Sequence, residues 1–425
     1  MERATLLVLV CLLQVTVWAR SIEASTEMIK RIDTHCHLVP PFYAELLQEH
    51  NIVAGGRAIP SWSATEHLEV MDLLNVSMSI VAVSTPAAVL MRNYQVKDSR
   101  QLARRLNEYA YNLSMEYPQR FSFFATLTLP DVEGSVAEAI YALDTLNAAG
   151  VMILATSSDE LLGSPRFEPL YAELDKRNAT VFVHPSQSPC PVQDTFDPIL
   201  PLPDIEKPAA EDIYALDSAN AGGVRILASS PEDLLRSPLF DKLEATESKN
   251  PSLSLCGGKD AFDKGSSGLP PYAVDFLLDT TRAAVNLIFR NMTRKYPNVK
   301  YIFAHSGGFL PFSTFRIVRI LMMLTKQTEE AIVAQLQAFY VDTALSASKY
   351  ALPSTISLLG TSHLTFGSDY PFAPPDAYVP NTENLDQFVR DTLTPDDGQQ
   401  INLKTASELF SHILSDDILA TMGFG

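Results

Sequence analysis

Four histidines and an aspartate of this chain follow short apolar runs in a way that suits a shared metal ion. His35 and His37 follow the run Ile-Asp-Thr, and strand side chains alternate faces, so both point to the same side. His184 follows Thr-Val-Phe-Val, His305 follows Tyr-Ile-Phe-Ala, and Asp369 follows Thr-Phe-Gly-Ser. Neutral imidazoles and a carboxylate that leave room for water or substrate make a catalytic divalent-metal site. Each residue taken alone is more often structural, and it is their convergence that predicts the site.

These residues converge only if the strands that carry them end at one rim. Short apolar runs alternate with helical patterns along the chain, which is typical of βα units around a parallel sheet. Eight such runs predict an α/β fold, a (β/α)8 TIM barrel, whose functional face lies at the carboxyl ends of the strands. The predicted strands are Ile29–His35, Met78–Ser84, Phe121–Leu127, Val151–Ala155, Thr180–His184, Val299–His305, Phe339–Thr343 and Leu364–Ser368. The predicted helices are Glu66–Leu74, Ser99–Glu116, Ser135–Ala148, Asp275–Lys295 and Thr328–Gln337.

One segment of the chain is repeated and does not fit eight strands. Residues Ile140–Leu170 recur with few changes as Ile213–Leu243, which predicts an extra βα-like unit. Only the first copy leads to His184, because the second has Gly257 at the matching position. A ninth strand would also change the strand number, shear and tilt of the barrel together. We therefore expect a barrel over residues 27–415 that is interrupted by a duplicated insertion at about 186–268, outside the sheet.

The first residues predict a route through the secretory pathway. Arg3 precedes the apolar run Leu6–Trp18, and small residues at Val17 and Ala19 suit a signal peptide over residues 1–19. That run is short for a spanning helix, so no stable membrane span is expected after cleavage. Asn-X-Ser/Thr triplets at Asn75, Asn112, Asn178 and Asn291 fit this route. A wrongly assigned first exon is the alternative, and the protein would then be cytoplasmic.

Composition limits the partners of the protein. The formal net charge is −18, which makes nucleic acid and anionic membrane faces poor partners. An anionic substrate would therefore need positive charge supplied locally, as a bound metal would do. Cys36, Cys190 and Cys256 lack the spacing of a thiolate zinc site.

The motifs around the five residues resemble amidohydrolase family 2. The His35-Cys-His37 segment, Val183-His184-Pro185, Ala304-His305-Ser-Gly-Gly-Phe-Leu-Pro311 and Phe366-Gly-Ser-Asp369-Tyr-Pro371 occur in the family's order. More narrowly they resemble the decarboxylases of aminocarboxymuconate semialdehyde, γ-resorcylate and 6-methylsalicylate. The segment Asp279-Thr-Thr-Arg-Ala-Ala-Val-Asn286 is most similar to the 6-methylsalicylate decarboxylases of fungal polyketide pathways, in secondary metabolism. The resemblance covers about Ile32–Pro185 and Pro270–Phe410, and it implies that the (β/α)8 barrel is of the metal-dependent hydrolase type.

The resemblance implies roles for individual residues. It makes His35, His37, His184 and Asp369 the ligands of one divalent metal, and His305 and Asp369 the catalytic groups. It implies zinc, with manganese as the alternative, because relatives that use manganese have glutamate in place of the first histidine. It also implies a homodimer or higher homo-oligomer in which Arg316 reaches the substrate carboxylate in a neighbouring subunit. An intramolecular salt bridge of Arg316 is an equal alternative.

The activity that the resemblance implies is the non-oxidative, metal-dependent decarboxylation of a small hydroxylated aromatic acid, in the narrow form 6-methylsalicylate to 3-methylphenol plus CO2. A metal-dependent hydrolase, such as a lactonase or amidohydrolase, is one alternative, because the same ligands can activate water. A diverged barrel without catalysis is another. Phe42, Tyr43, Phe309 and Phe312 are candidate walls for a flat substrate, although core packing is the role expected for most of them.

Overall fold

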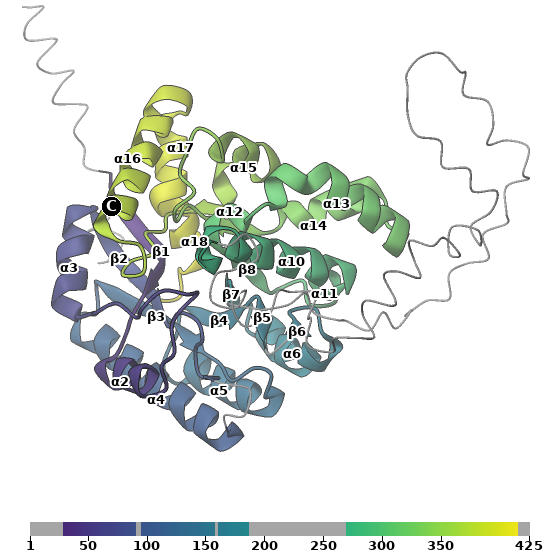
Figure 1. Cartoon of the computed structure of the whole chain (residues 1–425). Helices are drawn as coiled ribbons and strands as arrows, with labels where there is room; N and C mark the ends of the chain where they lie inside the picture. Colours follow the sequence, from purple (N-terminus) through teal and green to yellow (C-terminus); the bar gives the residue numbers. More distant parts are fainter. Residues whose placement is uncertain (1–28, 91–94, 158–159, 187–268, 415–425) are drawn as a thin grey trace, which may run out of the picture.

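Eight parallel strands form a barrel that is closed between its first and last strand (Figure 1). The computed structural model describes residues 29–90, 95–157, 160–186 and 269–414. The strand order follows the chain, and a parallel bridge between Asp33 and Phe366 joins the two ends. The strands are β1 (Arg31–His37), β2 (Val76–Ala82), β3 (Phe121–Thr126), β4 (Gly150–Leu154), β7 (Thr180–His184), β8 (Lys300–Phe303), β9 (Tyr340–Asp342) and β10 (Leu364–Thr365). The predicted fold class is confirmed.

Two apolar layers hold the barrel together, one inside the sheet and one between the sheet and the helices. The inner layer includes Ile32, Phe124 and Phe182, and the rings of Phe124 and Phe182 stack with centroids 5.3 Å apart. The outer layer contains the opposite faces of the same strands, such as Val181 and Val183 of β7. Because both faces are covered, the strands are continuous apolar runs rather than alternating ones. Phe182 also lies against the His35 ring at 4.9 Å, so the inner layer forms the floor of the predicted site.

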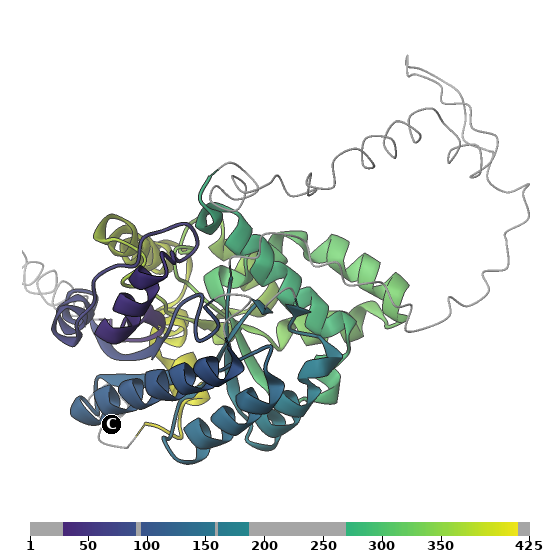
Figure 2. The ribbon, with the colours of Figure 1, turned by 60° about the horizontal axis from the view of Figure 1, so that its bottom comes forward.

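Helices surround the sheet and reverse the chain between strands (Figures 1 and 2). Several begin at side-chain caps, in which Ser63, Asp131 and Thr328 accept a backbone N–H of the first turn. The longer helices are α2 (Pro41–Glu49), α3 (Ala64–Leu73), α4 (Val96–Glu116), α5 (Val132–Asp144), α6 (Glu168–Lys176), α10 (Asp275–Phe289), α13 (Leu310–Thr325), α14 (Glu329–Gln337), α15 (Leu352–Leu359) and α16 (Pro375–Thr392). Shorter ones include α11 (Met292–Lys295), α12 (Ala304–Gly307), α17 (Pro395–Gln399) and α18 (Thr405–Leu409).

The predicted helix Asp275–Lys295 is interrupted, and the cause is local. It ends as α10 at Phe289, and α11 starts at Met292. Between them Asn291 has a left-handed backbone with φ of 61°. Asparagine tolerates this conformation better than most residues, so it reverses the chain without glycine.

The repeated segment is described only in its first copy. Strand β4, from that copy, lies in the sheet between β3 and β7, as expected. Residues 187–268, which include the second copy with Gly257, lie outside the described residues, and so do the predicted signal peptide and Cys190 and Cys256. Within the described ranges, no helix combines the length and the apolar composition that crossing a bilayer needs.

A deletion tests whether the barrel depends on the insertion. Rejoining Pro185 to the Gly268–Pro271 region should preserve folding and metal binding, since the eight strands of the sheet all lie outside residues 187–268. Circular dichroism and bound metal per chain are the measurements. An insoluble product, or a folded product that cannot hold metal, would show that the insertion is part of the barrel's core.

Candidate metal centre

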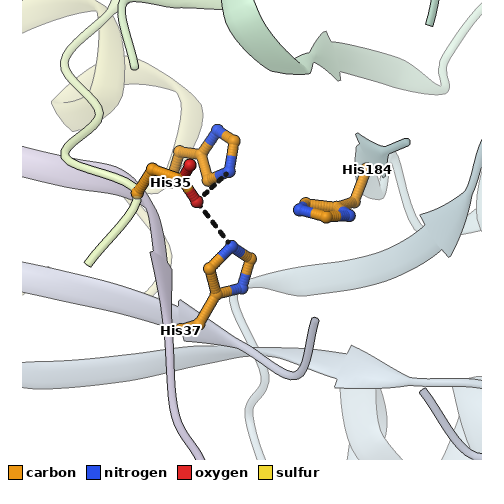
Figure 3. A group of neighbouring side chains, drawn as sticks. His35, His37 and His184 are labelled. Carbon is orange, nitrogen blue, oxygen red and sulfur yellow. Dashed lines mark hydrogen bonds and ion pairs between the residues drawn. The ribbon is translucent and has the colours of Figure 1, made fainter. Parts of the chain in front are cut away.

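Strand β1 presents His35 and His37 to one side, towards the barrel axis. Both imidazoles are buried, and their ring centroids lie 5.2 Å apart. Figure 3 shows the two rings beside a carboxylate and opposite His184, which projects from the end of β7. The centroid of His184 lies 5.4 Å from that of His35 and 4.9 Å from that of His37. The three histidines therefore face one space at the carboxyl ends of two strands.

Asp369 is the fourth member of this cluster, in the segment that follows β10. Its Oδ1 lies 3.1 Å from His37 Nε2 and 3.4 Å from His35 Nε2, contacts drawn as dashed lines in Figure 3. Its backbone N–H donates to His35 O at 2.7 Å, and its φ is 62°. Gly367 permits this approach, since a Cβ at that position would lie 2.8 Å from His35 Cβ.

Electrostatics in the cluster favour a positive charge at its centre. Burial lowers the pKa of His35, but the Asp342 and Asp369 carboxylates outweigh burial and raise it to about 10. Burial lowers the pKa of His37 and of His184, so both imidazoles are neutral at pH 7. Burial opposes ionisation of Asp369, yet hydrogen bonds to His35 and His37 hold its pKa well below the usual range. A proton on His35 thus balances buried carboxylates, and metal binding would release that proton.

The donor set fits one divalent metal. One ligand atom from each of His35, His37, His184 and Asp369 can be chosen so that all lie within 4.8 Å of one another, with all four residues buried. His35 Nε2 is buried, and its contact with Asp369 Oδ1 is a long one, at 3.4 Å. Three imidazole nitrogens and one carboxylate oxygen suit zinc and neighbouring transition metals. This is the set of ligands that the sequence predicts.

The Nδ1 atom of each of the three histidines also has an oxygen partner. His35 Nδ1 lies 2.8 Å from Asp342 Oδ2, His37 Nδ1 lies 3.2 Å from Ala82 O, and His184 Nδ1 lies 2.7 Å from Pro185 O. In each case an Nδ1–H that donates to oxygen leaves the Nε2 lone pair for a metal. The rings are therefore oriented as ligands before any ion binds.

Asp342, the last residue of β9, belongs to the site but is not among the residues that the sequence predicts there. It is fully buried, and its Oδ1 accepts from the backbone N–H groups of His305 and Ala344 at 3.0 and 2.9 Å. The same carboxylate therefore orients His35 and fixes the turn that carries His305. The signal that could have identified it is an aspartate at the end of the predicted strand Phe339–Thr343.

His305 lies next to the metal cluster rather than in it. Its ring centroid is 4.8 Å from that of His35, and its Nδ1 lies 3.0 Å from Ala344 O. Strand β8 ends two residues earlier, and His305 has φ of 56°. Left-handed backbone at a non-glycine residue costs energy and is concentrated at functional sites. His305 shares a second group of possible ligands with His35 and Asp342, but Asp342 already binds His35 and the backbone of His305.

A cavity of about 410 Å³ opens beside this cluster. His184, His305 and Asp369 line it, which places the metal cluster and the catalytic candidates in one space. Phe276 and Phe372 supply apolar walls, and their rings contact His184 at 6.2 Å and His37 at 5.3 Å respectively. The remaining lining residues are Ala54, Arg57, Ser84, Thr85, Tyr272, Ala273, Leu277, Leu345, Ser346, Ala373, Pro374, Asp376 and Ala377.

Arg57 is a second residue that the sequence analysis missed. It lines the cavity, is half-buried, and its guanidinium makes no ion pair with any described residue. A carboxylate substrate entering the cavity would therefore meet an unpaired cation. The surrounding sequence, Ala-Gly-Gly-Arg-Ala, lies in a loop and has no pattern that distinguishes it.

The aromatic residues expected as walls lie elsewhere. None of Phe42, Tyr43, Phe309 and Phe312 lines this cavity in the described part of the chain. Phe42 lies under the Arg105 guanidinium at 3.7 Å, and the buried Tyr43 hydroxyl donates to Ala87 O. Phe309 is 37% exposed and Phe312 is 89% exposed, since both lie at the start of the surface helix α13. Phe42 and Tyr43 pack in or against the core, the role expected for most of the four, and the aromatic walls of this cavity include Phe276 and Phe372.

Arg316 also lies on α13, on its exposed side, and pairs with no acidic residue of the described chain. The alternative of an intramolecular salt bridge is therefore not seen. Arg316 does not line the cavity of its own subunit.

Comparison with known proteins identifies the family. The family model described as amidohydrolase matches residues 32–201 and 193–411, and the chain belongs to that family. It is 28% identical over 398 residues to decarboxylase macB of Penicillium terrestre, covering 92% of this chain and 97% of that protein. It is 26% identical over 390 residues to the 6-methylsalicylic acid decarboxylase of Penicillium expansum, covering 90% and 97%. These relatives confirm the predicted enzyme class, a carboxy-lyase of a metal-dependent family.

Solved structures show the same fold. The crystal structure of an amidohydrolase II superposes with a TM-score of 0.66 at 25% identity, covering 90% of this chain and 100% of that chain. A dihydroxybenzoic acid decarboxylase from Polaromonas, solved with manganese and the inhibitor 2-nitroresorcinol, gives 0.61 at 18% identity, covering 92% and 99%.

Asp342→Asn tests the orientation of His35. The amide places an NH2 group where a carboxylate oxygen now accepts, so it opposes either the His35 ring or the backbone N–H groups of His305 and Ala344. We expect metal affinity to fall about 10- to 100-fold, measured by competition with a chelator. The exposed Asp391→Asn serves as a control and should bind metal normally. Unchanged affinity in Asp342→Asn would show that His35 needs no carboxylate partner.

Proposed function

We propose that this protein removes CO2 from a 2-hydroxybenzoate, with 6-methylsalicylate converted to 3-methylphenol as the specific reaction. The observation that carries the proposal is the cluster of His35, His37, His184 and Asp369 at a cavity that also presents Arg57. The relative from Penicillium expansum, named for 6-methylsalicylic acid, supports the choice of substrate. A volume of about 410 Å³ is of the size that holds small ligands.

We propose His35, His37, His184 and Asp369 as the ligands, with zinc as the metal and manganese as the alternative. When bound, the ion supplies a Lewis acid that neutralises the substrate's carboxylate and ortho hydroxyl. Three imidazole ligands out of four support zinc. The manganese in the Polaromonas structure supports the alternative. Metal analysis of protein purified without added metal would decide between them.

The chain's own residues then bind the substrate and move a proton. Arg57 pairs with the carboxylate, and the rings of Phe276 and Phe372 enclose the flat substrate. Asp369 accepts the proton that the substrate's ortho hydroxyl releases on binding and delivers it to the ring carbon that bears the carboxylate. The bond between that carbon and the carboxylate then breaks, CO2 leaves, and the ring becomes aromatic again as a phenolate that takes a proton from water. His305, whose ring centroid lies 4.8 Å from that of His35, sets the protonation of Asp369 and polarises the substrate. Positioning in a cavity away from bulk water strengthens these charge interactions.

We further propose that the protein is a homodimer joined through α13. Exposed apolar side chains gather on this helix, namely Phe312, Phe315, Ile320, Met323 and Leu324. Figures 1 and 2 both show α13 at the periphery of the molecule, where a second copy could cover it. Surface patches of this kind mark association sites. The same helix would carry the unpaired Arg316 to the neighbouring cavity.

Product analysis tests the reaction. Metal-loaded enzyme is incubated with a panel of salicylates and a panel of lactones, and CO2 and phenols are measured. We expect turnover of salicylates, best for 6-methylsalicylate. Asp369→Asn should lower kcat at least about a hundredfold, because it weakens a ligand and removes the proton donor. Turnover confined to the lactones would assign a hydrolase, and near wild-type turnover by Asp369→Asn would remove Asp369 from the mechanism.

Mixed dimers test the two arginines. Arg57→Gln and Arg316→Gln should each raise the KM for the carboxylate substrate by about tenfold or more, through loss of a charged hydrogen bond. If Arg316 acts on the neighbouring subunit, a heterodimer of the two variants has one intact site. An equal mixture should then regain about a quarter of wild-type activity at low substrate, as random dimers require. No recovery in a verified heterodimer would place Arg316 outside the neighbouring site.

A further inference from the structure

The polar residues of the segment Asp279–Asn286 face three different parts of the barrel. They lie on α10, the first long helix after residues 187–268. Thr281 Oγ1 accepts from the Phe309 N–H at 2.8 Å, and Asn286 Oδ1 accepts from the Gly163 N–H at 2.7 Å. Asp279, at the start of the segment, points to the ends of β4 and β7. Its side chain is 3% exposed, so its hydrogen bonds are fully sheltered from water.

The Asp279 carboxylate accepts from donors in three segments. Thr156, after β4, donates its hydroxyl to Oδ1 at 2.5 Å, and Arg282 donates to the same oxygen at 3.0 Å. Ser186, two residues after His184, donates its backbone N–H to Oδ2 at 2.9 Å and its hydroxyl at 3.1 Å. These contacts fix the chain immediately beyond the end of β7.

A single peptide group connects Asp279 to His184. The Ser186 N–H belongs to the same peptide unit as the Pro185 carbonyl, which lies 2.7 Å from His184 Nδ1. The Pro185–Ser186 bond is trans, so its C=O and N–H point in opposite directions within one plane. A carboxylate that holds the N–H therefore fixes the direction of the C=O. It also polarises the peptide, which strengthens the bond that the carbonyl accepts.

We infer that Asp279 is a positioning residue for the metal ligand His184, acting through the Pro185–Ser186 peptide. His35 has its carboxylate partner in direct contact, whereas His184 has a carboxylate one peptide unit away. The His184 carbonyl itself accepts from the Ala155 N–H at 2.8 Å, so the two successive peptide groups that follow the His184 Cα are both held. The effect on the ring is that Nδ1–H stays bound to Pro185 O and Nε2 stays directed at the cluster.

This inference rests on the proposed ligation by His184, and metal affinity tests both separately. Affinity for Zn²⁺ is measured by chelator competition on the full chain, together with the melting temperature of the metal-free protein. Asp279→Asn should weaken Zn²⁺ binding about tenfold or more, because the amide has one acceptor oxygen and no charge, so its NH2 group opposes either the Ser186 N–H or Arg282. Asn286→Ala is the matched control on the same helix. It loses a buried bond to Gly163 and should lower the melting temperature without weakening Zn²⁺ binding.

Coupling to His184 distinguishes positioning from general destabilisation. In a His184→Ala background, Asp279→Asn should cause no further loss of Zn²⁺ affinity, since the two changes act on one ligand. If Asp279→Asn does not fold, Thr156→Val removes one donor to the carboxylate and should show a smaller loss with the same dependence on His184. Full affinity in Asp279→Asn, or a loss that persists without His184, would overturn the inference. Full Zn²⁺ binding by His184→Ala alone would instead overturn the proposed ligand set.

Discussion

The main-chain pairing between the first and the last strand of the barrel is the contact on which the site depends. Thr34 N–H donates to Phe366 O at 2.9 Å, His37 N–H to Tyr370 O at 2.6 Å, and Asp369 N–H to His35 O at 2.7 Å. These bonds join residues more than three hundred positions apart, and they interlock the two segments that carry His35, His37 and Asp369. A barrel that failed to close here would separate the first two imidazoles from the carboxylate.

Closure of the barrel also gathers buried carboxyl groups around the three imidazoles. Asp33, Asp342 and Asp369 are all buried. Asp342 Oδ2 lies 2.8 Å from His35 Nδ1, Asp369 Oδ1 lies 3.1 Å from His37 Nε2, and Asp33 Oδ1 accepts from the His35 N–H at 3.0 Å. Burial raises the pKa of Asp33 to about 7, while His35 is held protonated by its neighbours. Uncompensated buried charge is costly, so the cluster requires either that proton or a cation. The buried carboxylates therefore favour the binding of a metal cation between the imidazoles.

Backbone strain is stored around the same space. Among the residues that line the cavity, His305, Leu345 and Asp369 have φ values of 56°, 49° and 62°. Each such conformation at a non-glycine residue costs about 1–3 kcal/mol and persists only where the surroundings impose it. Here hydrogen bonds impose it, through Asp342 for the turn at His305 and through His35 O for Asp369. These hydrogen bonds thus offset the backbone strain of residues that line the cavity.

The sequence by itself determined the barrel, the order of its strands and the metal cluster. Apolar runs of strand length are visible without context, and a parallel barrel places all their carboxyl ends on one rim, so residues such as His184 and Asp369 had to meet. The tertiary structure alone decided the contacts that depend on loop conformation and on the direction of side chains and helices. The sequence by itself assigns no role to Asp342 or Asp279. Their roles become visible only from the contacts of Asp342 with His35 and of Asp279 with the Ser186 N–H. Arg57 lies in a loop without periodicity, and Phe309 does not line the cavity of its own chain because it precedes α13, whose outward direction strand spacing does not encode.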